Sequence, residues 1–317
     1  MSSLGLHPDR RIWMDGELVP WEAATVHVLS HSLQRGSLVF DYMSVHATPR
    51  GAAIFRLAEH LERFAVSTQL VGLELPRSLG ELRAAVCATL RANPGASAIK
   101  ISAYLPSIEV DVVPLDERVS LAIAAYDPGR DVVARKGRRW EPKLEYRVWI
   151  EKERRNRRPD IVEPQAKVAA NYVSPMVAKW RAKRAGYDEV LLLDAQGNVA
   201  EGPTTNVFLV DRDGCLVTPP EETVLHGVTR RSLIEIAKHE GVALRVEPVP
   251  PAALFEAAEV FLSGTTAGVL PVVSLDGRPV GDGRPGPRSR ELRRRYFEIA
   301  EGRDPAFAHW LTLADEA

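Results

Sequence analysis

The stretch Pro164-Gln165-Ala166-Lys167-Val168-Ala169-Ala170-Asn171-Tyr172 is nearly uncharged and contains a single lysine. It surrounds one lysine with small and uncharged residues, in a chain that has only 8 lysines among its 41 basic residues. Removal of water from an ammonium group disfavours its charge and leaves the neutral amine that attacks an aldehyde. Lys167 is therefore a candidate nucleophile, although the same pattern also fits a buried lysine or one that reaches the surface.

Three later segments add groups that suit a phosphorylated ligand. Ala200-Glu201-Gly202 places a carboxylate at the end of a predicted strand. Leu225-His226-Gly227-Val228-Thr229-Arg230 leads into a predicted helix, whose free N–H groups and dipole favour an anion. Ser263-Gly264-Thr265-Thr266-Ala267-Gly268 follows a strand with two hydroxyls and glycines that allow close backbone approach. Each segment alone fits an ordinary turn or helix cap, but their order along the chain favours a common site.

The hydrophobic pattern predicts two parts of mixed α and β structure. Alternating and helical spacing in the first part predicts strands at residues 11–14, 17–19, 26–29, 38–46, 52–55, 98–105 and 119–126, and helices from residue 57 and over 79–91. The second part is predicted to contain strands at 144–150, 189–194, 206–210, 215–218, 243–246 and 259–263, and helices at 177–185, 230–240 and 288–300. The intervening segment lacks either period. We therefore expect domains at residues 1–126 and 141–317, with a connection at 127–140.

Composition excludes several classes of protein. The 317 residues are 45% apolar and 26% charged, with a formal net charge of −1, so no overall field favours nucleic acid or a membrane surface. Two cysteines are too few for a disulfide framework or a cysteine-based zinc site, and we expect no metal. The basic run 152–158 resembles a solvated loop more than a nucleic-acid module. Because Met1–Arg11 is polar and no run of about 18 apolar residues follows, we expect a cytoplasmic protein with small-molecule partners.

The chain resembles the fold-type IV pyridoxal-phosphate (PLP) aminotransferases, and most closely the branched-chain aminotransferases. The resemblance extends over nearly the whole chain. Its motifs are Ile12-Trp13-Met14-Asp15-Gly16-Glu17, Val26-His27-Val28-Leu29-Ser30-His31, Phe55-Arg56, His60-Leu61-Glu62-Arg63, Lys167 with Asn171-Tyr172, Ala200-Glu201-Gly202, Asn206-Val207-Phe208, Gly227-Val228-Thr229-Arg230 and Ser263-Gly264-Thr265. The resemblance implies a small α+β N-terminal domain, a larger pseudo-barrel C-terminal domain, PLP between them, and a homodimer whose active site borrows residues from the partner.

The resemblance also implies the roles of individual residues. Lys167 would hold PLP covalently and then move the proton between the substrate Cα and the cofactor. Glu201 would accept a hydrogen bond from the pyridine nitrogen, and Tyr172 would contact the phenolic oxygen. The phosphate would be bound by Arg63, Val228, Thr229 and Thr265, and the substrate carboxylate would lie near Thr265 and Thr266.

The substrate wall departs from the branched-chain pattern. Phe40-Asp41-Tyr42-Met43-Ser44 stands where these enzymes usually carry Phe-Glu-Gly-Ile-Arg, so Phe40, Tyr42 and Ser44 should share one strand face. Arg35 replaces the usual tyrosine, and Lys100 stands where many members have arginine. These two cations suit either a distal or an α-carboxylate.

We therefore predict transamination between a branched-chain or other aliphatic L-amino acid and 2-oxoglutarate. A D-amino-acid or (R)-amine transaminase of the same fold is the main alternative. Aminodeoxychorismate lyase, which uses the same lysine and phosphate site for elimination, is a further one.

Overall fold

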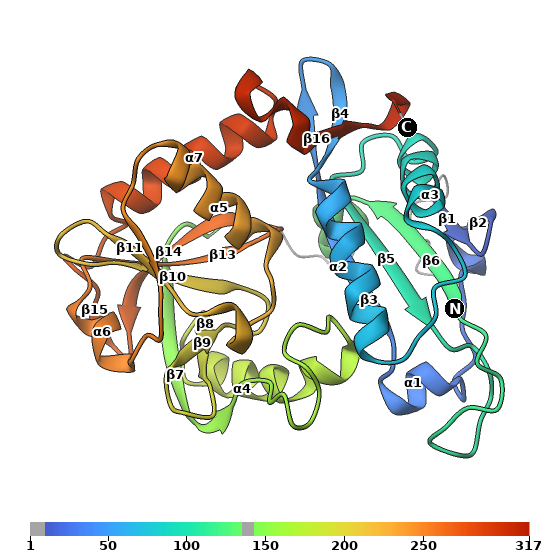
Figure 1. Ribbon diagram of the computed structural model, residues 1–317, viewed down its shortest axis with the longest axis horizontal. Helices are drawn as coiled ribbons and strands as arrows, with labels where there is room; N and C mark the ends of the chain where they lie inside the picture. The colour runs from blue at the N-terminus through green and yellow to red at the C-terminus, as the bar shows by residue number, and fades with distance from the viewer. Residues whose placement is uncertain (1–9, 135–142, 317) are drawn as a thin grey trace. The chain divides into compact units, whose positions relative to one another are not determined.

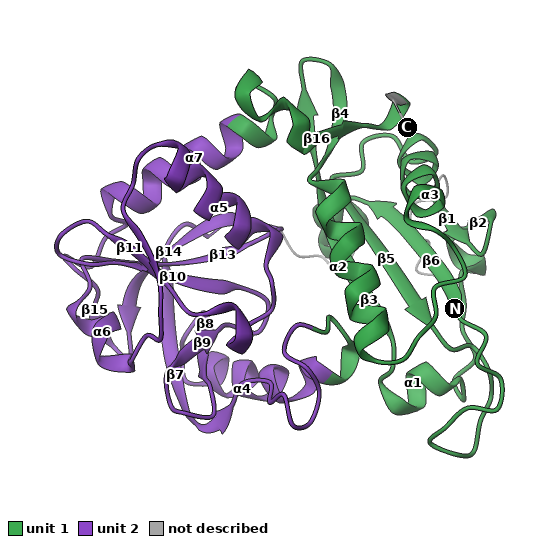
Figure 2. Cartoon of the chain, in the orientation of Figure 1, with its two compact units in different colours: residues 1–141, 166–170, 299–317 green, residues 142–165, 171–298 purple. Residues whose placement is uncertain are grey.

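The computed structural model describes residues 10–134 and 143–316, and the chain forms two compact units (Figure 2). Unit 1 comprises Met1–Glu141, Ala166–Ala170 and Ile299–Ala317. Unit 2 comprises Pro142–Gln165 and Asn171–Glu298. The polar N-terminal residues 1–9 and residues 135–140 of the predicted connection lie outside the described residues. The lysine segment 166–170 thus packs with unit 1, although the sequence on either side of it belongs to unit 2.

Unit 1 is built on a seven-stranded antiparallel sheet with the order β16-β4-β3-β5-β6-β1-β2 (Figure 1). Its strands are β1 (Arg11–Met14), β2 (Glu17–Pro20), β3 (Val39–Thr48), β4 (Gly51–Phe55), β5 (Ala98–Tyr104), β6 (Ser120–Tyr126) and β16 (Leu311–Leu313). Asp15 and Gly16 both have positive φ and form the two-residue turn between β1 and β2. The predicted strand at 26–29 is wrong. His27 accepts hydrogen bonds there from the N–H groups of Leu29 and Ser30, which bends the segment into a turn.

Two helices cover this sheet, and a third short helix precedes β3. They are α1 (His31–Arg35), α2 (Leu57–Leu70) and α3 (Leu79–Arg91). The helix α3 begins with a capping box in which Ser78 and Glu81 satisfy each other's backbone N–H groups. The helix α2 buries Leu57, Leu61 and Phe64, as the spacing of these residues predicts.

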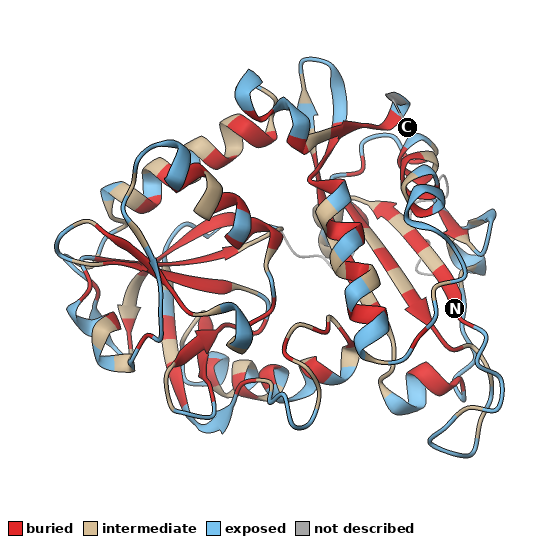
Figure 3. Ribbon diagram, viewed as in Figure 1, coloured by how far each residue is buried: buried red, intermediate tan, exposed pale blue. Residues whose placement is uncertain are grey.

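Unit 2 contains a closed ring of six strands. Its nine-stranded sheet has the order β12-β11-β10-β13-β14-β7-β8-β9, and the ninth strand, β15, pairs with β14 outside this order. An additional β10–β9 pairing closes the ring. The strands are β7 (Tyr146–Arg155), β8 (Glu189–Leu193), β9 (Val199–Glu201), β10 (Asn206–Val210), β11 (Leu216–Thr218), β12 (Leu244–Val246), β13 (Glu259–Gly264), β14 (Gly268–Leu275) and β15 (Arg278–Pro279). Figure 3 shows the ring strands largely buried. A barrel-like sheet is thus present, as predicted.

The strand β14 was not predicted, because Pro271 interrupts its apolar pattern. Proline lacks the N–H that a strand donates to its neighbour, so it argues against a central strand. In the structure, Pro271 faces Phe261 of β13, and the ladder to β7 starts only at Val272. The missing donor therefore falls just before that ladder begins.

Four helices pack around the ring: α4 (Val173–Arg184), α5 (Val228–His239), α6 (Pro251–Glu256) and α7 (Pro287–Ala300). Ala178 and Ala182 seat α4 against Val190 and Leu192 of β8. The Glu259 carboxylate accepts hydrogen bonds from the N–H groups of Arg288 and Ser289 and so caps the start of α7. No helix in the described part of the chain is long and apolar enough to cross a membrane.

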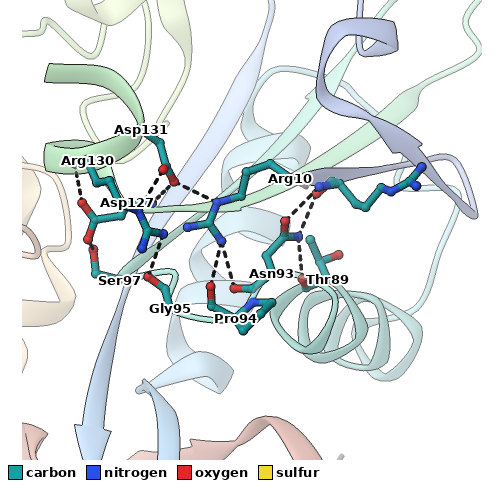
Figure 4. Close-up of polar contacts among 10 residues, drawn as sticks. Arg10, Thr89, Asn93, Pro94, Gly95, Ser97, Asp127, Arg130 and Asp131 are labelled. Carbon is teal, nitrogen blue, oxygen red and sulfur yellow. Dashed lines mark hydrogen bonds and ion pairs between the residues drawn. The ribbon is translucent and has the colours of Figure 1, made fainter. Parts of the chain in front are cut away.

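A buried polar network fixes the beginning of the predicted connection to unit 1 (Figure 4). Arg10 donates from Nε to Asp131 Oδ2 at 2.8 Å and from Nη1 to the carbonyl of Asn93 at 3.0 Å. Burial raises the pKa of Asp131, but hydrogen bonds from Asp127 N–H and Arg130 and the charge of Arg10 outweigh it and lower the pKa. Residues Pro128–Val133 consequently form an ordered helical turn of unit 1.

Candidate functional site

Lys167 is held by backbone hydrogen bonds to the residues that lead into β3. Its carbonyl accepts from Phe40 N–H at 3.0 Å, and Ala169 N–H donates to the carbonyl of Leu38 at 2.8 Å. On the other side, Lys167 N–H donates to Ser67 Oγ at 3.1 Å. The neighbours Ala166 and Val168 are buried, whereas Lys167 is partly exposed. The fold thus fixes the backbone of this lysine, and the residue as a whole is not fully buried.

The side chain of Lys167 lies over an aromatic ring that it shares with a second lysine. Its Nζ is 4.9 Å from the centroid of the Phe40 ring, and Lys100 Nζ is 4.7 Å from the same centroid. Because Lys100 and Tyr42 face each other across β5 and β3, three predicted substrate residues lie within one short stretch of sheet. Phe40 and Tyr42 are half-buried and alternate with the buried Val39, Asp41 and Met43, as the strand period predicts.

A buried carboxylate holds Arg63 on α2. Asp41 Oδ2 accepts from Arg63 Nε at 2.8 Å, and Asp41 Oδ1 accepts from Arg63 Nη2 at 2.8 Å and from His60 Nδ1 at 2.7 Å. Burial raises the pKa of Asp41, but the Arg63 and His60 charges and hydrogen bonds outweigh it and lower that pKa. Burial lowers the pKa of His60 despite the nearby Asp41 charge. Asp41 therefore stays ionised and orients the Arg63 guanidinium.

Glu201 lies at the end of β9 in unit 2, and its carboxylate is enclosed by donors. Oε1 forms an ion pair with Arg157 Nη1 at 3.1 Å and accepts a hydrogen bond from Asn156 Nδ2 at 3.3 Å. Oε2 accepts from Asn206 Nδ2 and from Leu225 N–H, each at 3.2 Å. The Glu201 and Arg157 side chains are both only 3% exposed. A carboxylate in this setting is fixed in direction and accepts hydrogen bonds strongly.

Arg157 also reaches a second predicted site residue, because its Cζ lies 4.9 Å from the centroid of the Tyr172 ring. Tyr172 ends the short 3-10 helix Ala169–Tyr172 and precedes α4. Sequence reasoning missed the roles of Arg157 and Asn156, which belong to the basic run 152–158. It also missed Asp41 and His60. The charge of that run predicts a solvated loop, so it gave no indication that Arg157 is buried. Only the apolar residues of β7, which precede Arg157, could have indicated burial.

The two segments of unit 2 that are predicted to bind an anion each pack closely against residues 204–206 through a glycine. Val228 and Thr229 are the first residues of α5 and are buried. A Cβ at Gly227 would lie 1.9 Å from Asn206 Oδ1, and one at Gly264 would lie 3.2 Å from the carbonyl of Thr204. Glycine is therefore required at position 227. Thr265 and Thr266 occupy the turn between β13 and β14, next to the buried hydroxyl of Ser263.

Arg35 contacts a loop of unit 1. It ends α1, is exposed, and donates from Nη2 to the carbonyl of Val110 at 3.1 Å. Its predicted contact with a substrate carboxylate stays a prediction. In the described residues no group of His, Cys, Asp and Glu side chains is arranged to hold a metal ion.

Each unit, taken by itself, provides groups fixed in position: a partly exposed lysine and an oriented guanidinium in one, and a fixed carboxylate in the other. The first two belong to unit 1 and the third to unit 2. These are the groups required to bind a phosphate, to react with an aldehyde and to accept a hydrogen bond from a ring nitrogen. None of the three depends on an exposed and freely rotating side chain for its placement.

Comparison with known proteins gives a consistent family. The model for amino-transferase class IV matches residues 38–275. The chain is 34% identical over 307 residues to a branched-chain-amino-acid aminotransferase of Pseudomonas aeruginosa, which covers 96% of this chain and 97% of that protein. It is also 34% identical over 309 residues to the branched-chain-amino-acid aminotransferase of Escherichia coli, with the same shares covered.

Solved structures agree with this result. The branched-chain amino acid aminotransferase of Escherichia coli matches with a TM-score of 0.88 and 31% identity over 97% of this chain and 99% of that chain. A branched-chain aminotransferase from Thermoproteus uzoniensis with norvaline matches with a TM-score of 0.87 and 32% identity over 96% and 98%. A further branched-chain amino acid aminotransferase, solved in complex with N-(5'-phosphopyridoxyl)-L-glutamate, matches with a TM-score of 0.89 and 36% identity over 96% and 99%. The predicted two-domain α+β fold and aminotransferase activity are thereby confirmed. The chain belongs to the class IV aminotransferases.

Proposed function

We propose that this chain is a PLP-dependent aminotransferase that moves an amino group between a branched-chain or other aliphatic L-amino acid and 2-oxoglutarate. The observation that carries the proposal is its likeness, over 96% of the chain, to aminotransferases named for branched-chain amino acids. One of the solved relatives contains a phosphopyridoxyl derivative of glutamate, which combines the cofactor with one of the proposed substrates.

The residues present fit PLP. In unit 2, Arg157 Nε, Thr205 Oγ1 and Ser263 Oγ are buried and have no hydrogen-bond partner among the described residues. Buried polar atoms in native proteins are normally paired, so these three call for polar groups from another molecule. A cofactor with a ring nitrogen, a phenolic oxygen and a phosphate supplies such groups. The glycine at position 227 also allows the start of α5 to lie directly against the Asn206 side chain, which donates to Glu201.

We assign the cofactor contacts as follows. Lys167 holds PLP through its amine, Glu201 accepts from the pyridine nitrogen, and Tyr172 contacts the phenolic oxygen. The phosphate is bound by the Arg63 guanidinium, the N–H groups of Val228 and Thr229, and the Thr265 hydroxyl, with Thr266 nearby. When bound, PLP withdraws electrons from the substrate Cα.

The chain's own residues then carry out the proton transfer. The amine of Lys167 takes the proton from the substrate Cα, a role that suits a lysine that is fixed at its backbone and whose Nζ lies beside the ring of Phe40. Glu201 keeps its orientation because an ion pair and three hydrogen bonds fix its oxygens. Tyr172 is held in turn by the overlying Arg157.

We assign the substrate contacts to Arg35, Phe40, Tyr42, Lys100, Thr265 and Thr266. Lys100 and Lys167 approach one aromatic ring, so a carboxylate beside Phe40 can pair with Lys100 while the amine of Lys167 stays near the reacting atom. The closeness of Lys100 to Lys167 also favours the second candidate function, that of a D-amino-acid transaminase. If Lys100 binds the α-carboxylate, the chain acts on D-amino acids.

We also propose a homodimer. Large apolar side chains are exposed in two neighbouring segments: Val26, Val28, Leu29, Leu33, Ile108, Val110, Val112, Val113 and Leu115. Val110 is 96% and Leu115 is 95% exposed. The segments are linked because His31 Nε2 bonds to the carbonyl of Val112 at 2.8 Å. An apolar surface of this kind marks a protein interface, and a second copy of the chain is the partner that we propose. A cytoplasmic location stays a prediction.

Single-turnover absorbance of the holoenzyme tests the proposed function. The amines to compare are L-leucine, L-glutamate, D-glutamate, D-alanine and (R)-1-phenylethylamine. We expect L-leucine and L-glutamate to convert the cofactor fastest. If a D-amino acid or the (R)-amine reacts about tenfold faster than either, a difference of about 1.4 kcal/mol in barrier, the branched-chain assignment is overturned. Pyruvate release from aminodeoxychorismate without transfer to a keto acid would indicate the lyase.

A further inference from the structure

We propose that Ser67 is a positioning residue for Lys167: its buried hydroxyl fixes the backbone from which the reactive amine extends. This inference rests on the proposed function, because it takes Lys167 as the residue that carries the cofactor and moves the proton. It assigns a role to a side chain on a different element, 100 residues away along the chain.

The geometry shows why this hydroxyl matters. Ser67 lies on α2 and is completely buried, and its Oγ accepts from Lys167 N–H at 3.1 Å. The Lys167 carbonyl is occupied on the opposite side by Phe40 N–H at 3.0 Å. The peptide groups on both sides of the Lys167 Cα are thus tied to unit 1, one by a strand residue and one by Ser67.

The remaining bonds of the lysine segment do not replace that of Ser67. Ala169 N–H donates to Leu38 and Ala170 N–H donates to Gly36, so both tie the chain after the lysine to the lead-in of β3. Ser67 supplies the bond that fixes the N–H of Lys167 itself. Without it, the Lys167 N–H, which lies beside buried Ala166, loses the Ser67 acceptor, and buried backbone donors in native structures are normally paired.

The helix α2 also carries Arg63, the proposed phosphate ligand. His60, Arg63 and Ser67 follow the i, i+3, i+7 spacing of one helix face. Asp41 holds the first two, whereas Ser67 holds Lys167. Four residues separate Arg63 from Ser67, a rise of about 6 Å along the helix axis. This single helix therefore fixes the proposed phosphate ligand and the proposed attachment point relative to each other.

Ser67→Ala and a matched control test the proposal. The control is Thr68→Val, which removes the adjacent buried hydroxyl, because Thr68 Oγ1 donates only within α2, to the carbonyl of Ala65 at 2.8 Å. Ser67→Cys is a second variant that keeps a similar volume with a much weaker acceptor. Each holoenzyme is compared with the wild type by hydrogen exchange of peptides spanning Lys167 and by single-turnover kinetics with L-glutamate.

We expect Ser67→Ala to expose the Lys167 amide to exchange about tenfold faster, while amides of α3 and α5 are unchanged. The rate of the proton-transfer half-reaction should fall about tenfold or more with KM changed less than about twofold, because a small displacement of a catalytic group is costly. Ser67→Cys should give an intermediate effect, and Thr68→Val should give neither.

Three results would overturn the proposal: unchanged exchange at Lys167, an unchanged half-reaction rate, or equal effects of Ser67→Ala and Thr68→Val. The variant Lys167→Ala separates this outcome from failure of the proposed function. If Lys167→Ala keeps turnover, the assignment of the lysine is wrong. If it abolishes turnover while Ser67→Ala has no effect, only the role of Ser67 is wrong.

Discussion

Replacement of Glu201 by glutamine removes one negative charge from a buried ion pair while preserving side-chain volume. Arg157 Nη1 lies 3.1 Å from Glu201 Oε1, and both side chains are 3% exposed. With an effective dielectric constant of about 20, Coulomb's law gives about 5 kcal/mol for unit charges at this distance. The arginine stays buried in the variant, so its desolvation is no longer offset by a partner charge.

Hydrogen bonding adds to the effect. Each Glu201 oxygen faces two groups that carry N–H hydrogens, so the glutamine NH2 must face at least one donor. Arg157 keeps one bond, from Nη1 to the carbonyl of Pro164, and the glutamine carbonyl still accepts on one side. We therefore expect Glu201→Gln to lower the free energy of unfolding by about 3–5 kcal/mol, the range for a broken buried pair.

Urea denaturation at neutral pH measures this change, with the double variant Glu201→Gln, Arg157→Met as the control. The double variant should regain most of the lost stability, because no unpaired charge stays buried. The amino-acid half-reaction of Glu201→Gln should also slow by orders of magnitude, with cofactor retention affected less. If Glu201→Gln lowers the free energy of unfolding by less than about 1 kcal/mol, or if the double variant does not recover stability, the Glu201–Arg157 ion pair does not stabilise the fold.

Three further predictions concern unit 1. Arg63→Ala should weaken PLP retention by about 1.5–3 kcal/mol, measured by cofactor dialysis, and excess PLP should restore part of the activity unless Arg63 makes no phosphate contact. Arg35→Ala should slow glutamate far more than leucine in single-turnover kinetics, since only glutamate has a second carboxylate, and equal effects would contradict that assignment. Burial lowers the pKa of His60 below 6.5, and the Arg63 and His60 charges outweigh burial to lower the pKa of Asp41 below 3.8. Both groups then bind protons more readily when unfolded, so the melting temperature should fall as pH drops below about 6.5 and again below about 4. A profile of His60→Gln identical to that of the wild type would refute the His60 contribution.

Elements with a clear period could be predicted from the sequence. The helix at Leu79–Arg91 has the predicted limits, because its capping residue and apolar spacing agree. The strand predicted at residues 26–29 is wrong, because apolar alternation alone cannot show whether a neighbouring strand is present to pair with it. The strand β14 was not predicted because it contains Pro271. Whether a proline disrupts a strand depends on which side of the strand needs its N–H as a hydrogen-bond donor.

The candidate site could also be predicted only in part. Motif order was enough to single out Lys167, Glu201 and Arg63, yet none of their partners could be inferred. Asp41 is contributed by β3 to a helix residue 22 positions away, and Arg157 lies in a run whose charge suggests solvent. Contacts between distant segments depend on strand register and helix rotation, which local residue patterns do not fix.

The most direct test of the account is reduction of the holoenzyme with borohydride followed by peptide mapping. Lys167 is partly exposed, its backbone is tied to Phe40 and Ser67, and it lies in the predicted cofactor motif. We expect a single phosphopyridoxyl group on the peptide that contains Lys167. A label on Lys179 or Lys183, or no labelled lysine at all, would contradict it.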